Sequence, residues 1–188
     1  MKNQRGLTLI EVLATLTIST VLFGVVLMLL SSTSLQSKSS GEKYNADAEI
    51  RRTMDSISKE ISDSNQAYVT TNELRYVTYA SGSKEVKSLY YDGVATTLSM
   101  YVFKTANIQD NVTIATPGIY LYKRELSSHV TGVQYLPTVG TTPLTGRNLD
   151  GGTGFRIVVS FTFQRSKLFG GHENYTVKRE TGYKLLQY

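Results

Sequence analysis

The 188-residue chain contains no cysteine, no tryptophan and only two histidines. Without cysteine there is no disulfide framework, no thiolate metal site and no cysteine nucleophile. His129 and His172 lie far apart, in segments typical of strands or loops. The motifs G-x-S-x-G and H-E-x-x-H are also missing, and the SGSK segment at 81–84 lacks the spacing of a phosphate-binding P-loop. We therefore expect a protein that is not an enzyme and that uses neither a cofactor nor a metal ion.

The positive charge of the chain is modest, with a formal net charge of +5. This excess alone does not identify a nucleic-acid-binding protein. Residues 156–188 nevertheless hold six Lys or Arg against two Asp or Glu, with Tyr175, Tyr183 and Tyr188 among them. Basic residues beside aromatics are what a groove for single-stranded nucleic acid would use. A solvated strand face would show the same pattern, and we favour that interpretation over nucleic-acid binding.

One long apolar run, residues 7–30, follows a short polar segment that contains Lys2 and Arg5. The run is 24 residues long, and 17 of them are apolar. As a helix it would span roughly 36 Å, enough to cross a bilayer core of about 30 Å with some tilt. The positive-inside rule then places the N-terminus in the cytoplasm. An ordinary signal peptide fits poorly, because its apolar region would be shorter and would end at a cleavage site with small residues.

Glu11 is the only charged residue in this apolar run. An ionised acid at a bilayer centre costs about 2.5–3.5 kcal/mol on insertion scales, although a position near the end of the run lowers that cost. A carboxylate in a spanning segment therefore indicates a functional site that needs a partner. The run contains no Lys, Arg or His, so we expect the partner to come from elsewhere. A free amine at Leu7 would supply a positive charge if the chain were cut after Gly6.

The segment GLTLIEVL, residues 6–13, resembles the N-terminal signature of type IV pilins and type II secretion pseudopilins. That signature combines a short basic leader, a Gly, a large apolar residue and a Glu at the fifth mature position. Lys2 and Arg5 supply the leader charge, Gly6 stands at the cut, and Glu11 is the fifth residue after it. The family usually has Phe as the first mature residue, so Leu7 is a mild departure. The close resemblance covers about the first 30 residues.

The resemblance implies how the chain is processed and what it joins. A prepilin peptidase would cut between Gly6 and Leu7 and would methylate the new amine of Leu7, which keeps its positive charge. Glu11 would pair with the amine of a neighbouring subunit and would favour one register between subunits, a use for which buried ion pairs are better supported than for stability. The implied partners are the prepilin peptidase, other pilin or pseudopilin subunits and the inner-membrane platform of the assembly machine. The implied location is a single-pass membrane protein whose domain lies outside the cytoplasmic membrane, in a filament on the cell surface or in the periplasm.

The segment 31–66 begins with a serine-rich stretch that is typical of a flexible linker. Farther on, apolar residues recur at spacings of four, three and four: Ile50, Met54, Ile57 and Ile61. Charged residues lie largely off this stripe: Asp47, Arg51, Arg52, Asp55, Lys59 and Asp63. We predict an amphipathic helix to about Ser64 that packs its stripe on the rest of the protein. Gly24, Gly41 and the serines are places where such a long helix could bend.

From residue 67 onward the pattern is that of β-strands. Short runs typical of strands occupy 74–80, 86–91, 97–103, 111–116, 118–126 and 132–136. The strongest is FRIVVSFTF, 155–163, in which five apolar residues alternate with the others, as in a strand that packs one face on a core. The alternating apolar residues are Phe155, Ile157, Val159, Phe161 and Phe163. A last run, 175–187, is interrupted at Gly182.

Turn signals separate these runs. The pair Asp92-Gly93 predicts a tight hairpin, and the segment 169–172 predicts another. The Pro- and Gly-rich segment 137–154 is typical of a long loop. Within it, DGGTG at 150–154 offers oxygen ligands of the kind that Ca²⁺ takes, but Asp150 supplies only one carboxylate. We therefore interpret that stretch as a flexible turn.

A helix followed by six to nine strands predicts an α+β fold, in which a long N-terminal helix packs on a largely antiparallel β-sheet, as in pilins. The first half of that helix is transmembrane. The expected division is a leader at 1–6, a transmembrane and assembly helix at 7–30, its amphipathic continuation at 31–66 and a β-rich domain at 67–188. The large number of strands resembles minor subunits, above all the minor pseudopilin J of type II secretion. The tip-type minor pseudopilin typically lacks the Glu, so Glu11 argues against that role.

The sequence is compatible with two functions. The favoured one is a minor pilin or pseudopilin of a type IV pilus-like or type II secretion-like filament. The alternative is a signal-anchored surface or periplasmic binding domain, with DNA among its candidate ligands, that does not polymerise. The sequence does not distinguish secretion, adhesion and motility, or DNA uptake in competence.

Overall fold

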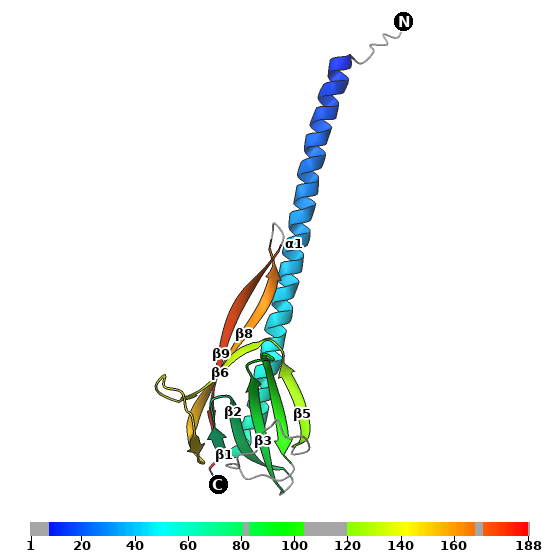
Figure 1. Ribbon diagram of the computed structural model, residues 1–188. Helices are drawn as coiled ribbons and strands as arrows, with labels where there is room; N and C mark the ends of the chain where they lie inside the picture. The colour runs from blue at the N-terminus through cyan, green and yellow to red at the C-terminus, as the bar shows by residue number, and fades with distance from the viewer. Residues whose placement is uncertain (1–7, 81–82, 104–119, 168–170, 188) are drawn as a thin grey trace. The chain divides into compact units, whose positions relative to one another are not determined.

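The computed structural model describes residues 8–80, 83–103, 120–167 and 171–187 (Figure 1). Within these ranges one helix, α1 (Leu9–Ser62), precedes nine strands. Their bounds are β1 (Ser64–Val69), β2 (Glu73–Ala80), β3 (Ser83–Asp92), β4 (Thr97–Phe103), β5 (Tyr120–Ser127), β6 (Val130–Pro137), β7 (Arg147–Leu149), β8 (Gly154–Ser166) and β9 (His172–Lys184). The predicted helix-then-strands order, and with it the α+β class, is confirmed.

The chain divides into two compact units. Unit 1 consists of Met1–Tyr44 together with Arg165–Glu173, and unit 2 consists of Asn45–Gln164 together with Asn174–Tyr188. Unit 1 therefore contains most of α1 and the connection between β8 and β9. Unit 2 contains the last turns of α1 and both sheets, except for the end of β8 and the start of β9.

The α1 residues of unit 2 form the amphipathic segment that the spacing of apolar residues predicts. Ile50, Met54, Ile57 and Ile61 each expose 8% or less of their surface. Thr53 lies on the same buried face, and its Oγ1 donates a hydrogen bond to the carbonyl oxygen of Leu126 at 3.1 Å, so the hydroxyl is not left unpaired. The charged residues of this segment lie off the buried face, as predicted.

The strands of unit 2 form two sheets. One has six strands in the order β5-β4-β3-β2-β1-β7, and the other has three in the order β6-β8-β9. The pairings β1–β2, β1–β7, β2–β3, β3–β4, β4–β5 and β6–β8 are all antiparallel. Short connections such as that between β3 and β4 allow this arrangement, because antiparallel neighbours need only a hairpin.

The main core of unit 2 joins the helix stripe to one face of each sheet. The predicted face of β8 is fully confirmed, because Phe155, Ile157, Val159, Phe161 and Phe163 expose 7% or less, while the residues between them are half-buried. A second, smaller cluster consists of Val77, Val86, Tyr101 and Phe103. Since side chains alternate between the faces of a strand, this cluster lies on the opposite face of the six-stranded sheet from Tyr76 and Leu89.

A buried ion pair accompanies the second cluster. Arg75 Nε lies 2.7 Å from Glu73 Oε1, and Arg75 Nη2 lies 3.1 Å from Glu73 Oε2. Ser88 Oγ on the neighbouring strand donates to Glu73 Oε1 at 2.7 Å, and the Arg75 guanidinium lies 5.9 Å from the centre of the Phe103 ring. The two charges are thus paired, hydrogen-bonded and largely removed from water.

Two strands fall where the sequence did not predict any. The helix ends at Ser62, slightly before the predicted end, and β1 begins at Ser64. Ser64 is fully buried, and its Oγ donates to the carbonyl oxygen of Ile61 at 2.6 Å, which closes the last helical turn. β1 and β7 pair with each other, and β7 lies inside the predicted long loop 137–154. Their strand conformation depends on this pairing between distant segments, because neither has a strong local β pattern.

α1 continues without interruption through the serine-rich stretch and through Gly24 and Gly41, in agreement with the prediction that the helix continues beyond residue 30. Two local expectations were wrong. β9 continues through Gly182, where a Cβ would have nothing within 4 Å, so the glycine weakens the strand without ending it. The turn at Asp92-Gly93 is four residues long rather than tight, with the Asp92 carboxylate accepting the N–H of Val94 at 2.9 Å. The strand predicted at 111–116 lies outside the described residues.

Candidate functional site

The first half of α1 exposes an apolar surface. Its large apolar side chains from Leu9 to Leu30 expose between 46% and 81% of their surface. The helix contains a window long and apolar enough to cross a bilayer, and none of that window is buried. An apolar surface of this extent indicates contact with lipid or with other protein chains.

Hydroxyl groups within this apolar surface bond to the helix backbone. Thr17 Oγ1 donates to the carbonyl oxygen of Leu13 at 2.8 Å, and Thr20 Oγ1 donates to the carbonyl oxygen of Thr17 at 2.8 Å. Thr15 Oγ1 similarly lies 2.9 Å from the carbonyl oxygen of Val12. These bonds satisfy the hydroxyl donors inside the helix, so the threonines are compatible with a lipid environment.

Thr8 and Glu11 form a reciprocal hydrogen-bonded cap at the start of α1. The N–H and the Oγ1 of Thr8 both donate to Glu11 Oε2, each at 2.9 Å, and the N–H of Glu11 donates to Thr8 Oγ1 at 3.4 Å. This is the capping box, in which a Thr and a Glu three residues later satisfy backbone donors that the helix leaves unpaired. The negative charge of Glu11 also lies at the end of the helix where the helix dipole favours an anion.

The cap gives Glu11 a partner within its own chain. Sequence reasoning considered only cations as partners and missed this one, although the pattern T-x-x-E at 8–11 is its recognised signature. Both bonds from Thr8 go to Oε2 of Glu11, and within the described part of the chain Oε1 makes no hydrogen bond. The other predicted site residues, Lys2, Arg5, Gly6 and Leu7, lie outside the described residues.

In unit 1, Glu42 of α1 binds the end of β8. Glu42 Oε2 accepts the N–H of Ser166 at 2.7 Å, and Oε1 accepts the Ser166 hydroxyl at 2.9 Å. The bond from the Ser166 N–H, then that from its hydroxyl, lowers the pKa of Glu42, with smaller contributions from Lys38 and His172. These bonds fix the end of β8 on the helix within this unit.

Within the described ranges, neither histidine forms a catalytic group with its neighbours. Ser127 Oγ and His129 Nδ1 both contact the same oxygen of Glu49, at 2.6 Å and 3.0 Å. A nucleophilic serine needs a hydrogen bond to the histidine ring itself, and here the serine bonds to the carboxylate instead. His172 lies exposed in unit 1. Among the described residues, no group of three or more His, Asp or Glu could hold a metal ion.

The glycine-rich segment 150–154 forms a turn. The N–H of Thr153 donates to the carbonyl oxygen of Asp150 at 3.0 Å. A Cβ at Gly151 would lie 2.6 Å from the carbonyl oxygen of Leu186, so only glycine allows this approach of two backbone segments. Gly152 has a φ of 84°, which also favours glycine. Backbone geometry accounts for these glycines, which agrees with the interpretation of this stretch as a turn.

In the described part of the basic C-terminal segment, Tyr175 and Tyr183 do not form a stacking surface. The ring of Tyr175 packs 5.9 Å from that of Phe163, and the Tyr183 hydroxyl lies 3.2 Å from Ser58 Oγ. Both tyrosines are packed against the main core. Tyr188 lies outside the described residues. A groove for single-stranded nucleic acid needs exposed rings, which these two do not supply.

A helix with an apolar exposed half, an amphipathic second half and antiparallel sheets is the layout of a pilin-like protein. The family model described as the prokaryotic N-terminal methylation motif matches residues 1–27. This match supports the type IV pilin and pseudopilin family for the chain, and it points to a structural subunit rather than an enzyme. Neither curated proteins nor solved structures give a match for this chain.

Proposed function

We propose that the chain is a minor pilin or pseudopilin subunit that is cut after Gly6, N-methylated at Leu7 and polymerised through α1 into a filament. The observation that carries this proposal is the methylation motif at 1–27, which precedes a helix with an exposed apolar half. Such a surface is stable in a bilayer before assembly and against the helices of other subunits after it.

Glu11 is the assembly contact in this proposal. Thr8 holds Oε2 of the carboxylate and leaves Oε1 for the amine of a neighbouring Leu7. The amine keeps its positive charge after methylation, so the pair is charge-assisted. An incoming subunit in the wrong register would leave both charges without partners in an apolar environment, which is costly.

The proposed location and partners follow from the same features. The N-terminus stays in the cytoplasm, α1 crosses the membrane, and unit 2 lies outside. The partners are the prepilin peptidase, other pilin or pseudopilin subunits and the platform of the assembly machine. The strand count and Glu11 favour a minor subunit of the J type rather than a tip subunit that lacks the Glu.

Processing is tested by mass spectrometry of the N-terminal peptide from the native host. We expect a chain that begins at N-methylated Leu7. The variant Gly6→Val should keep its full leader, because a branched side chain then replaces the glycine at the cut. Lys2→Gln is the matched control, since it changes the leader without changing the cleavage site. A chain that still begins at Met1, or one cut beyond residue 30, contradicts the proposal.

The alternative is an anchored binding domain that is never polymerised. Shearing of cells separates the two, because filament subunits leave the cell with the sheared fraction and an anchored domain stays in the membrane fraction. We expect the mature chain in both fractions, since a minor subunit is stored in the membrane before assembly. A mature chain that is found only in the membrane, under conditions in which filaments form, favours the anchored domain.

A further inference from the structure

Unit 1 contains a pocket of about 570 Å³ between α1 and the end of β8, which the proposed assembly contact does not use. Five residues at helical spacing form its α1 side: Ser32, Leu35, Gln36, Ser39 and Ser40. Residues 165–167 form the other side, and Glu173 of β9 also lines the pocket. The volume falls within the range of about 300–1,000 Å³ that is typical of small-molecule sites.

The β8 side of the pocket is held against α1 by the contact between Glu42 and Ser166. The N–H and the hydroxyl of Ser166 both donate to the Glu42 carboxylate, at 2.7 Å and 2.9 Å. The N–H of Lys167 also donates to the carbonyl oxygen of Gly171 at 3.1 Å. The backbone of Arg165 and Lys167, on either side of Ser166, is therefore fixed beside the pocket without a ligand, which lowers the entropic cost of binding one.

The charged groups that line the pocket carry one excess positive charge. Arg165 and Lys167 share a single carboxylate, that of Glu173. Arg165 Nε contacts Glu173 Oε1 directly, whereas Lys167 Nζ lies 3.8 Å from Oε2, which is too long for a hydrogen bond. The Lys167 side chain is 52% exposed, so its ammonium group has donors left for a ligand. An anion with one negative charge would balance this set of charges.

The α1 side of the pocket adds uncharged donors. Within the described residues, the side chains of Gln36, Ser39 and Ser40 make no hydrogen bond. Ser32 differs, because its Oγ donates to the carbonyl oxygen of Leu29 at 2.9 Å and can only accept a further bond. Amides, hydroxyls and an ammonium group all donate hydrogen bonds to anionic oxygens. The pocket therefore suits a singly charged anion with several oxygens, such as a phosphodiester.

The pocket begins where the exposed apolar surface of α1 ends. That surface extends from Leu9 to Leu30, which is about 33 Å of helix, and the hydrocarbon core of a bilayer is about 30 Å thick. The headgroup region adds about 5–8 Å on each side, or about three to five residues of helix. When α1 crosses a membrane, Ser32 and Leu35 thus fall at the level of the lipid headgroups. Long basic side chains such as that of Lys167 suit this level.

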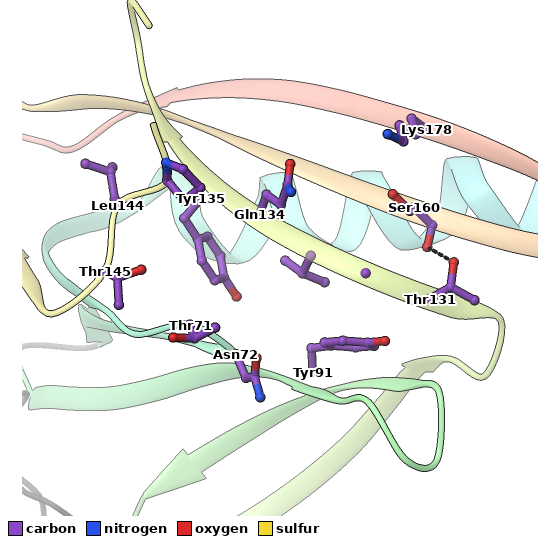
Figure 2. A pocket seen from close by; sticks show the side chains of 13 residues that line it. Thr71, Asn72, Tyr91, Thr131, Gln134, Tyr135, Leu144, Thr145, Ser160 and Lys178 are labelled. Carbon is purple, nitrogen blue, oxygen red and sulfur yellow. Dashed lines mark hydrogen bonds between the residues drawn. The ribbon is translucent and has the colours of Figure 1, made fainter. Parts of the chain in front are cut away.

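The cavity of about 410 Å³ beside β6 in unit 2 does not bring its polar groups together in this way. Figure 2 shows Asn72 and Tyr91 on one side of β6 and Lys178 on the other. Lys178 also belongs to β9, which β8 separates from β6. A single small ligand cannot contact both sets of residues, so we assign no ligand to this cavity.

We propose that the unit 1 pocket binds the headgroup of a phospholipid that has one negative charge and hydroxyl groups, such as phosphatidylglycerol, from the outer leaflet of the membrane. Lys167 and Gln36 bind the phosphate oxygens. Ser39 and Ser40, farther from the hydrocarbon core, bind the glycerol hydroxyls. The acyl chains lie along the exposed apolar surface of α1. The bound lipid holds the subunit at a fixed depth in the membrane before assembly, so this proposal rests on the membrane-inserted subunit of the proposed function.

The test uses the full-length chain in uncharged maltoside micelles, with short-chain phosphatidylglycerol and phosphatidylcholine as probes. The two lipids share the phosphate and the acyl chains, but phosphatidylcholine has no net charge. Amide chemical shifts in nuclear magnetic resonance spectra report binding. We expect phosphatidylglycerol to shift the amides of Ser39, Ser40, Ser166 and Lys167, and to bind about fivefold more tightly than phosphatidylcholine, as for one exposed charge pair.

Three variants test the residues of the pocket. Lys167→Gln should weaken phosphatidylglycerol by about three- to fivefold and remove the preference over phosphatidylcholine. Lys43→Gln is the matched control, because Lys43 is an exposed lysine of α1 in unit 1 outside the pocket, and it should retain the preference. Glu173→Gln should strengthen phosphatidylglycerol by about three- to fivefold, since it frees both cations from a competing carboxylate. A purely structural role of Glu173 would not produce tighter binding.

The outcomes separate the lipid site from its alternatives. The proposal is overturned if the two lipids bind equally well, if Lys167→Gln and Lys43→Gln act alike, or if inorganic phosphate binds as tightly as phosphatidylglycerol, which would indicate a site for a free anion. Flotation with vesicles of both lipids separates this proposal from the proposed function. A chain that stays out of the vesicles contradicts both, whereas an inserted chain whose pocket amides do not respond to phosphatidylglycerol contradicts only the lipid site.

Discussion

Thr8 and Glu11 close the first turn of α1 on each other, with two bonds from Thr8 to one oxygen of the Glu11 carboxylate. The same carboxylate therefore has two tasks in the proposed filament. It caps its own helix through Oε2, and it meets a neighbouring amine through Oε1. Capping involves only one chain, whereas pairing with the amine involves two chains. Variants of Thr8 and Glu11 can therefore separate the two roles.

Glu11→Ala should leave processing intact and reduce incorporation into filaments. The substitution removes a charge from an apolar segment, so inserting the variant into the membrane should cost no more free energy than inserting the unmodified chain. Assembly loses the partner of a buried amine, an effect that is typically about 3–5 kcal/mol and smaller near an interface. Glu11→Gln should be intermediate, because it keeps a hydrogen-bond acceptor without the charge. The measurement is the amount of subunit in sheared filaments relative to the mature subunit in the membrane.

Thr8→Ala separates capping from pairing. It removes the hydroxyl bond and leaves the carboxylate charge, at a cost to the helix of about 0.5–2 kcal/mol. We expect a smaller assembly defect than for Glu11→Ala. Thr17→Ala is the control, because that hydroxyl bonds only to the backbone of its own helix. If Glu11→Ala and Glu11→Gln both enter filaments as well as the unmodified chain, Glu11 is not an assembly contact.

Phe161→Asp should unfold unit 2. Phe161 exposes none of its surface, so the substitution would bury an unpaired charge and also lose a large apolar side chain. We expect a loss of more than about 4 kcal/mol in the free energy of unfolding, measured by urea denaturation with near-ultraviolet circular dichroism of the tyrosines. Gln164→Asp, at an exposed position of the same strand, should change it by less than about 0.5 kcal/mol. If Phe161→Asp and Gln164→Asp lowered the free energy of unfolding equally, the loss would not come from burying the charge in the core.

The sequence predicted the elements whose patterns are local and periodic. The stripe at Ile50, Met54, Ile57 and Ile61 recurs at helical spacing, and β8 alternates over five apolar residues. Both faces are buried as expected. In these segments a single buried face selects the conformation, so the period of the apolar residues is sufficient information.

The sequence did not predict features that depend on distant segments. β1 is a strand because it pairs with β2 and β7, and the short β7 has no pattern of its own. The pocket of unit 1 combines Gln36 and Ser39 with Arg165 and Lys167, which lie far apart in the chain. The cap between Thr8 and Glu11 is different, because it is local. The pattern T-x-x-E at 8–11 indicates it, and considering only cations as partners of Glu11 left it out.

The buried pair of Glu73 and Arg75 gives a prediction about stability. Glu73→Gln or Arg75→Met alone should lower the free energy of unfolding by about 3–5 kcal/mol, since each removes one charge of a pair that is largely removed from water. The double variant Glu73→Leu with Arg75→Met should recover most of that loss, because apolar side chains of similar size suit this cluster. Urea denaturation provides the measurement for all three variants.

Glu180→Gln is the control for the buried pair. Glu180 Oε1 lies 2.7 Å from Arg156 Nη1, but 47% of the Glu180 side chain is exposed. Glu180→Gln should lower the free energy of unfolding by less than about 1 kcal/mol, as for most exposed ion pairs. A double variant that is less stable than either single variant would contradict the view that the pair is replaceable by apolar packing.

The contact between Glu42 and Ser166 predicts a pH dependence in unit 1. The pKa of Glu42 is lowered from its ordinary value of about 4.5, chiefly because the carboxylate accepts the Ser166 N–H. The contact is therefore fully formed above pH 4.5, and it is lost as the pH falls through the lowered pKa. We expect the Ser166 amide resonance to shift with a midpoint below that ordinary value when the chain is titrated with acid in micelles. Glu42→Gln should remove this transition, and Glu125→Gln, at an exposed position of β5, should retain it. A Ser166 amide that does not titrate, or that titrates at the ordinary value or above, would show that the carboxylate is not held by these bonds.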